Sequence, residues 1–183
     1  MYRLSLILIL VPLAALAGRI DYVSVTRDGP RYVLEGEAFV AAQPAAVYAA
    51  ITDYNSLDKL DKGIAESRLL ERIDDNIALV YTRLTGCVIV FCRKVERVER
   101  VEEVSDTEVQ SVVVPQEQAD IAYERSSWRL SAEADGTRIK YRTEIEPDFW
   151  IPAFIGPAVL RGVLKRRVSR TLGNLEQAAK NYQ

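Results

Sequence analysis

The chain has 183 residues, and its composition, 49% hydrophobic and 27% charged, is typical of a globular protein. The 24 basic and 26 acidic residues leave a net charge of -2, so no overall basic field favours nucleic acid, and we expect no nucleic-acid partner. Histidine is absent, which removes the commonest general base and metal ligand, and two cysteines alone argue against a zinc site. We expect neither a metal nor another cofactor.

The N-terminus has the features of a secretory signal peptide. Arg3 precedes a largely apolar run of 13 residues from Leu4 to Leu16, and Ala15-Leu16-Ala17 gives the small-x-small pattern of a cleavage site. A membrane-spanning helix needs roughly 20 apolar residues, so a permanent anchor is the weaker alternative. We predict a signal peptide over residues 1–17 and an exported, periplasmic or otherwise extracytoplasmic protein that is soluble after cleavage.

Residues 18–183 are predicted to form a single α+β domain. After an exposed-looking lead, the alternation over 32–41 predicts a strand. Pro44 then opens a helix that ends near Asp53, and a short helical turn follows Asn55. Turn signals between β-branched stretches predict four further strands, at about 65–73, 77–86, 93–104 and 107–114.

The third of these four segments has two interpretations. Val95, Val98, Val101 and Val104 recur every three residues between Glu and Arg, a spacing that suits a helix face better than a strand. The segment is also rich in β-branched residues, which favour a strand, so taken alone it fits a helix and a strand equally well.

Beyond Pro115 the sequence predicts a hairpin and then a long helix. Ala134-Asp135-Gly136 is a strong turn signal between strands at 123–134 and 137–146. Alternation gives each strand one apolar face, which should look inward. From Ile155 to Tyr182, apolar residues spaced by three and four define one helical stripe. We predict a helix-grip fold, in which a curved antiparallel sheet wraps around the long C-terminal helix.

Two motifs and this order of elements resemble the START-like (SRPBCC) superfamily. The motifs are the helix end V-x-x-x-I-T-D-Y at Val47–Tyr54 and the run P-D-F-W-I-P-x-F-I-G-P at Pro147–Pro157. Within the superfamily, residues 32–182 most resemble the polyketide cyclase/dehydrase and coenzyme Q-binding START-domain group. The resemblance implies that residues 93–104 form a strand. It also implies an elongated apolar cavity between sheet and helix, in which members bind lipids, quinones, sterols or polyketides.

The inward apolar and aromatic positions are the candidate cavity residues, with ordinary core packing as the alternative for each. They are Tyr81, Trp128, Leu130, Ile139, Tyr141, Phe149, Trp150, Phe154, Val159 and Val163. The carboxylates Glu96, Glu99, Glu102 and Glu103 alternate with Arg97 and Arg100, as cross-strand pairs on a solvated face do.

No catalytic residue is predicted, and the expected function is the non-enzymatic binding or transport of a hydrophobic small molecule by a monomer. The alternatives are an enzyme of the cyclase or dehydratase type, as the resemblance implies, and a protein-interaction module. Fold alone does not decide among these three classes.

Cys87 and Cys92 are the only cysteines, and an exported protein meets an oxidising compartment, so we predict a disulfide. In a straight strand their Cα atoms would lie roughly 16 Å apart, too far for the bond, so a turn is required. Val88, Ile89, Val90 and Phe91 would then form an exposed apolar tip. An unbroken buried strand with two free thiols is the alternative.

A basic cluster on the C-terminal helix is the last candidate feature. Arg161, Lys165, Arg166, Arg167 and Arg170 place five positive charges within ten residues. A solvated helix face explains them without any function. The sharper hypothesis is that Arg161, Lys165, Arg166 and Arg170, together with the apolar tip, make peripheral contact with anionic lipid headgroups.

Overall fold

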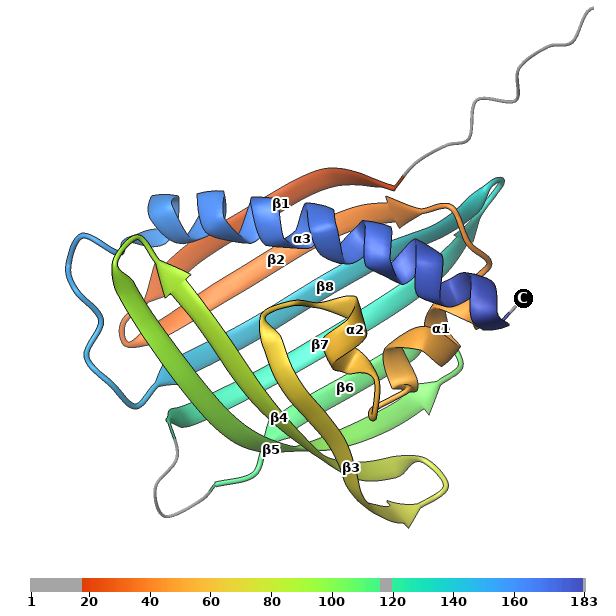
Figure 1. Ribbon diagram of the computed structural model, residues 1–183, viewed down its shortest axis with the longest axis horizontal. Helices are drawn as coiled ribbons and strands as arrows, with labels where there is room; N and C mark the ends of the chain where they lie inside the picture. The colour runs from red at the N-terminus through yellow and green to blue at the C-terminus, as the bar shows by residue number, and fades with distance from the viewer. Residues whose placement is uncertain (1–17, 116–119, 183) are drawn as a thin grey trace, which may run out of the picture.

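One curved antiparallel sheet of eight strands wraps around a long C-terminal helix in the computed structural model, which describes residues 18–115 and 120–182 (Figure 1). The strands are β1 (Arg19–Asp28), β2 (Arg31–Val40), β3 (Ile64–Asp74), β4 (Ile77–Val88), β5 (Phe91–Ser105), β6 (Glu108–Val113), β7 (Ile121–Glu133) and β8 (Gly136–Pro147). Their order in the sheet is β1-β2-β8-β7-β6-β5-β4-β3, so the sheet is not closed and β1 and β3 are its edges. The predicted helix-grip fold is confirmed.

The predicted signal peptide, residues 1–17, lies outside the described residues. Within the described part of the chain, no helix is both long and apolar enough to span a membrane.

Strand β1 corrects the interpretation of the N-terminal lead as an exposed segment. It pairs with β2 from Arg19↔Phe39 to Asp28↔Arg31, through a turn in which Gly29 has a φ of 57°. Such a φ suits glycine because it has no Cβ. Val25 is the one buried side chain of this edge strand, so the strand lacks the strong apolar alternation by which the others were predicted.

Strand β5 resolves the valine spacing in favour of a strand. The segment pairs with β4 on one side and β6 on the other. Successive side chains of a strand point to opposite faces, so valines three residues apart alternate between the faces. Val95 and Val101 are buried, whereas Val104 on the other face is exposed. The period of three therefore combines two sets of valines that face in opposite directions.

Within the described ranges, three helices fill the concave side of the sheet. They are α1 (Pro44–Thr52), α2 (Leu57–Leu60) and α3 (Pro157–Ala179), which a short 3-10 turn, η1 (Lys180–Tyr182), extends. Pro44 and Pro157 each occupy the first turn of their helix, where the missing N–H costs no helical hydrogen bond. Figure 1 shows α3 lying across the sheet with its C-terminal half close to α1.

The main core lies where α1 and the C-terminal half of α3 meet the sheet. Val40 and Val47 are fully buried there, and they pack with Leu130, Leu172 and Leu175. Burial of side chains of this size contributes about 1.5 to 3 kcal/mol each. Because this core occupies one end of the concave side, the space between the middle of α3 and the sheet is left for a cavity.

The β4–β5 hairpin contains the predicted disulfide. Cys87 and Cys92 are directly opposite in the strand register, with their Cα atoms 4.0 Å apart and their sulfur atoms bonded. Ile89 and Val90 form the turn between the strands, and Ile89 has a φ of 59°. The arrangement agrees with the predicted turn and places the apolar tip at the end of a cross-linked hairpin.

Candidate functional site

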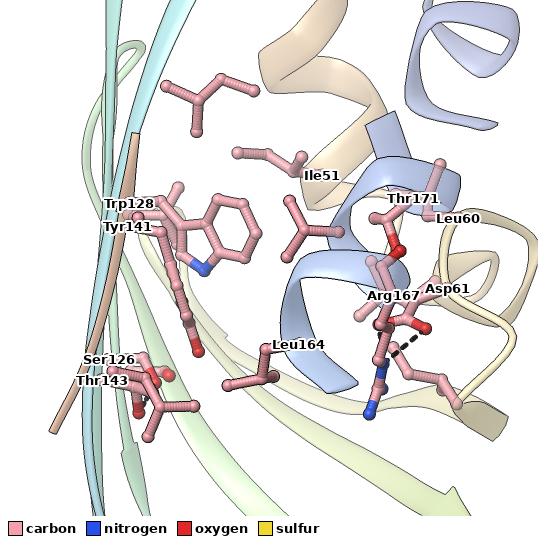
Figure 2. A pocket seen from close by; sticks show the side chains of 18 of the residues that line it. Ile51, Leu60, Asp61, Ser126, Trp128, Tyr141, Thr143, Leu164, Arg167 and Thr171 are labelled. Carbon is pink, nitrogen blue, oxygen red and sulfur yellow. Dashed lines mark hydrogen bonds and ion pairs between the residues drawn. The ribbon is translucent and has the colours of Figure 1, made fainter. Parts of the chain in front are cut away.

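A cavity of about 410 Å³ separates α3 from the concave face of the sheet (Figure 2). Most of its wall is apolar and comes from the strands, from α3 and from the region of α1 and α2. The apolar side chains of the wall include Leu34, Ile51, Leu57, Leu60, Ile64, Val80, Leu84, Val101, Val109, Trp128, Ile139, Ile145, Leu164, Val168, Leu172 and Leu175.

Two aromatic rings on the sheet face the helix across the cavity. Trp128 of β7 and Tyr141 of β8 are directly paired in the register, and their ring centroids lie 4.5 Å apart. Figure 2 shows both rings projecting from the sheet, with Leu164 pointing from α3 toward them. The three side chains bound the middle of the cavity, where an apolar ligand would contact both layers of the fold.

The sheet wall also carries three charged groups that are largely shielded from solvent. The Arg97 guanidinium donates hydrogen bonds to Glu124 and to Thr82, and its second terminal nitrogen lies 3.0 Å from Glu99. The side chains of Arg97, Glu99 and Glu124 are only 15%, 10% and 3% exposed. Ser111 donates to Glu99 over 2.8 Å. Every charge in this cluster therefore has a hydrogen-bonding or ionic partner within the protein.

The charges of this cluster do not balance. One guanidinium faces two carboxylates, so the cluster has a net charge of -1 when both carboxylates are ionised and is neutral when one is protonated. Burial, aided by the charge of Glu99, raises the pKa of Glu124 despite the opposing effect of Arg97. Burial alone would lower the pKa of Arg97, but Glu99 and Glu124 outweigh it and the pKa is raised.

These positions correct the prediction that the carboxylates of β5 all lie on a solvated face. Glu102 does lie on the outer face and is exposed. Arg97, Glu99 and Glu103 have the opposite parity and face inward. The alternation along the strand could have predicted this, because Val95 and Val101 are separated from Arg97 and Glu99 by even numbers of residues and so share their face.

A polar pair of hydroxyls lies between the charged cluster and the aromatic rings. Ser126 donates to Thr143 across the strands over 2.7 Å, and both residues are buried. Burial, and next the charge of Glu124, raise the pKa of the neighbouring Tyr141 hydroxyl. The cavity wall thus changes from polar at Glu124 to aromatic at Trp128 along β7, since residues 124, 126 and 128 share a face.

A third inward carboxylate, Glu103, connects α1 and the segment after it to the sheet. Glu103 accepts hydrogen bonds from the hydroxyls of Tyr48 and Tyr54, at 2.8 and 2.9 Å, and from Arg72 at 3.1 Å. Burial and the bond to Glu103 raise the pKa of Tyr48 to about 12. Tyr54 also lines the cavity. Glu103 is therefore bonded to three groups of the protein itself and is not a candidate for chemistry on a ligand.

An ion pair links α3 to the turn after α2 at one side of the cavity. The Arg167 Nε lies 2.7 and 2.8 Å from the two carboxylate oxygens of Asp61 (Figure 2). Gly63 leaves room for the guanidinium, because a Cβ there would lie 2.2 Å from Arg167 Cζ. Both charged side chains line the cavity and are partly exposed, at 36% and 21%. The pair is a partly exposed contact between α3 and the turn after α2, at the edge of the cavity.

Three of the ten predicted cavity residues line this cavity, namely Trp128, Ile139 and Tyr141. Leu130 lies beyond them in the main core. Tyr81 does not line the cavity. Its neighbours Val80 and Thr82 do, and successive side chains of a strand point to opposite faces, so Tyr81 faces away from the cavity. Its ring lies under the Arg68 guanidinium instead.

The five other predicted residues also lie outside the lining. Val159 and Val163 belong to α3, but the helix turns about 100° per residue and presents Leu164, Val168 and Leu172 to the cavity instead. Phe149, Trp150 and Phe154 belong to the connection between β8 and α3, and Trp150 and Phe154 point into solvent. Sequence reasoning also missed Asp61 and Arg167, because their pairing depends on a contact between distant parts of the chain.

Comparison with known proteins supports the assignment of the fold. The family described as "Polyketide cyclase / dehydrase and lipid transport" matches residues 32–180. The chain belongs to this family. The family is part of the START/SRPBCC superfamily, so the predicted resemblance is confirmed. A search of curated proteins found no match.

Solved structures with the family fold cover nearly all of the domain. A protein from Thermus thermophilus is 16% identical, with 82% of this chain and 99% of that chain covered and a TM-score of 0.63. A STAR-related lipid transfer protein from Xanthomonas axonopodis is 18% identical, with 86% and 100% covered and a TM-score of 0.62. The di-domain ARO/CYC StfQ from the steffimycin biosynthetic pathway is 13% identical, with 83% and 51% covered and a TM-score of 0.58.

Proposed function

We propose that this protein binds and carries a hydrophobic small molecule, such as a lipid or a quinone, in the cavity between the sheet and α3. The observation that supports the proposal is the cavity itself, whose volume of about 410 Å³ falls within the usual range of ligand pockets, about 300 to 1,000 Å³. A pocket of this kind is mostly apolar with a few polar groups that orient the ligand. The wall described above has this character.

The arrangement of the wall suggests how a ligand would be oriented. Its apolar part would lie between Trp128 and Leu164, where burial of apolar surface contributes about 25 cal/mol per Å². A polar group would lie near Ser126 and Thr143, whose hydroxyl oxygens can accept a hydrogen bond from it, because their own protons are donated to Thr143 and to the Arg125 carbonyl. Glu124, with its raised pKa, adds a further polar group at the same end.

We propose further that the protein works outside the cytoplasm as a monomer. The disulfide between Cys87 and Cys92 supports this location, because disulfides persist in oxidising compartments and are rare in the cytosol. The predicted signal peptide provides the route of export.

A cyclase or dehydratase activity is the second candidate, and one observation favours it. Glu124 and Tyr141 face the same cavity, and the pKa of each is raised above its ordinary value. A carboxyl group with a raised pKa keeps its proton to a higher pH and is a stronger base once ionised, so it can exchange a proton with a bound substrate. An enzyme would change the mass of a ligand during incubation, whereas a carrier would release it unchanged.

Filling the cavity tests the binding function. Leu164→Trp would place a larger side chain in the space between α3 and the aromatic pair, so uptake of a fluorescent fatty acid or quinone analogue should be lost. Ser169→Trp is the matched control, because Ser169 is exposed on the same helix. If the space is truly open, Leu164→Trp should keep the melting temperature close to wild type. A large loss of stability, with no saturable uptake by wild type, would contradict the proposal.

A further inference from the structure

Two segments far apart in the sequence meet at one end of the molecule. The first is the apolar tip, residues 88–91 of the β4–β5 hairpin. The second is the connection of residues 148–156 between β8 and α3. Phe91 of the tip lies 6.4 Å from Phe149 and 6.5 Å from Trp150, measured between ring centroids. Figure 1 shows the hairpin and the connection side by side at the N-terminal end of α3. We call the two segments together the docking end.

The docking end contains the most exposed large hydrophobic side chains of the described residues. Val90 is 83% exposed, Trp150 73%, Ile89 66% and Phe154 55%, and no other large hydrophobic side chain in the described ranges reaches these values. Single exposed hydrophobic residues need no explanation, but a group of four at one end of a molecule indicates a surface that contacts an apolar partner.

The aromatic rings of Phe91 and Phe149, which lie beneath this exposed surface, are held in place by a neighbouring cation. The Arg93 guanidinium lies 5.1 Å from the ring centroid of Phe91 and 4.8 Å from that of Phe149, so one cation spans rings of both segments. The disulfide closes the hairpin just behind the tip. Because the surface is already ordered, contact with a partner costs little conformational entropy.

Positively charged side chains lie on the segments next to this apolar surface. Arg161, Lys165 and Arg166 are exposed on the first turns of α3, directly after the connection. Within residues 18–115 and 120–182, no ion pair involves any of these three side chains or Arg93. Asp148 is the exposed carboxylate within the connection itself. Along residues 88–93 and 148–166, four cations thus accompany one carboxylate, although the whole chain is slightly acidic.

We propose that the docking end binds the surface of an anionic lipid bilayer, with Trp150, Phe154 and the turn at Ile89-Val90 inserted among the headgroups and the cations beside the lipid phosphates. Tryptophan is favoured at the membrane interface because its ring is apolar while its N–H group is polar. A bilayer fits better than a protein partner because it supplies both an apolar layer and negative charge, the two features that this surface complements. The proposal does not depend on which ligand the cavity holds.

The direction of α3 predicts that its cations differ in how much they contribute to membrane binding. The helix runs away from the docking end (Figure 1). With a rise of 1.5 Å per residue, Arg170 lies about 13 Å farther along the helix than Arg161. Electrostatic attraction to the membrane decays over a Debye length of about 8 Å in physiological salt. Arg161 should therefore contribute more to membrane binding than Arg170.

Co-sedimentation with vesicles tests the proposal. The full chain would be expressed with its N-terminal segment and purified from the cell envelope, so that all variants share the same N-terminus. It would then be mixed with phosphatidylcholine vesicles with and without phosphatidylglycerol. Wild type should bind the anionic vesicles preferentially, and Trp150→Ala should weaken this binding about tenfold or more. Arg161→Glu should weaken it by at least about fivefold, and Arg170→Glu by less.

Val90→Asp should also abolish the vesicle binding, and Ile73→Asp is its matched control. Ile73 is a half-exposed aliphatic residue of the β3–β4 hairpin, away from the docking end. Unchanged melting temperatures would show that the variants are folded, since all the altered side chains are exposed. Equal vesicle binding by wild type, Trp150→Ala and Val90→Asp would overturn the proposal. The proposal would also be overturned if wild type did not bind vesicles but formed a dimer that Val90→Asp dissociates, because the surface would then bind a second copy of the chain.

Discussion

Replacement of Arg97 by methionine is the most informative change within the cavity wall. Methionine has nearly the length of the arginine stem, so the variant removes the charge while it keeps much of the packing. In Arg97→Met, Glu99 and Glu124 would remain buried with no cation between them, because Arg97 is the cation that contacts both. Arg100→Met is the matched control, since Arg100 lies on the outer face of the same strand and pairs with the exposed Glu102.

Removal of one partner from a buried ion pair typically costs about 3 to 5 kcal/mol of unfolding free energy, because the remaining charge is uncompensated. The exposed pair of Arg100 should contribute at most about 1 kcal/mol. The pKa of Glu124 is already raised in the wild-type protein, and Arg97 is a group that lowers it. Loss of Arg97 should therefore raise this pKa further.

The raised pKa fixes the sign of the pH dependence. A carboxyl group whose pKa is higher in the folded than in the unfolded state favours the folded state at low pH, and this contribution is lost as the pH rises through the folded-state pKa. The destabilisation by Arg97→Met should thus be largest at alkaline pH. It should shrink as the pH falls toward the ordinary glutamate pKa of about 4.3, where the carboxyls become neutral.

Urea unfolding of wild type, Arg97→Met and Arg100→Met at a mildly acidic and a mildly alkaline pH measures these differences. If Arg97→Met is unfolded at alkaline pH, it should recover its folded signal when the pH is lowered. The double variant Arg97→Met/Glu124→Gln should regain part of the loss, because one buried charge is then gone. A cost for Arg97→Met that equals that of Arg100→Met, or that does not change with pH, would refute the buried-charge reasoning.

Three further outcomes are expected. The double change Cys87→Ser/Cys92→Ser should lower the unfolding free energy by about 2 kcal/mol, which is the chain-entropy value for so short a loop. Equal urea midpoints for oxidised and reduced wild type would argue against a constraining disulfide. Arg167→Ala should change the unfolding free energy by no more than about 1 kcal/mol, because the ion pair is partly exposed. It should nevertheless speed the release of a fluorescent ligand several-fold in stopped-flow measurements, because the pair with Asp61 links α3 to the turn beside the cavity. Unchanged release would exclude this side of the cavity as the exit. Intact mass of the envelope protein should place the N-terminus at or near Gly18, whereas a full-length chain in the membrane pellet would favour the anchor.

The fold could be predicted from the sequence because its signals are local. The turn at Ala134-Asp135-Gly136 and the apolar alternation on each side of it predicted the β7–β8 hairpin and the pairing face of Trp128 and Tyr141. The apolar stripe predicted α3. Strand β1 was missed because an edge strand with one buried side chain has little alternation to detect.

The cavity was harder to predict because it depends on contacts between distant residues. Charges are usually solvated, so Arg97 and Glu99 were assigned to the outer face, although their parity along β5 matches that of buried valines. Aromatic character suggested that Trp150 lines the cavity, but the connection after β8 directs it into solvent. On α3, an offset of one residue, from Leu164 to Val163, was enough to select the wrong side of the helix.

Native mass spectrometry of the protein purified from the cell envelope, without detergent that would strip a ligand, tests the central claim most directly. The binding function predicts a non-covalent adduct on wild type that collisional activation releases as an apolar small molecule, and that is absent from Leu164→Trp but retained by Ser169→Trp. Wild-type protein that carries no adduct, and that takes up none of the lipid or quinone analogues offered in excess, would contradict the claim.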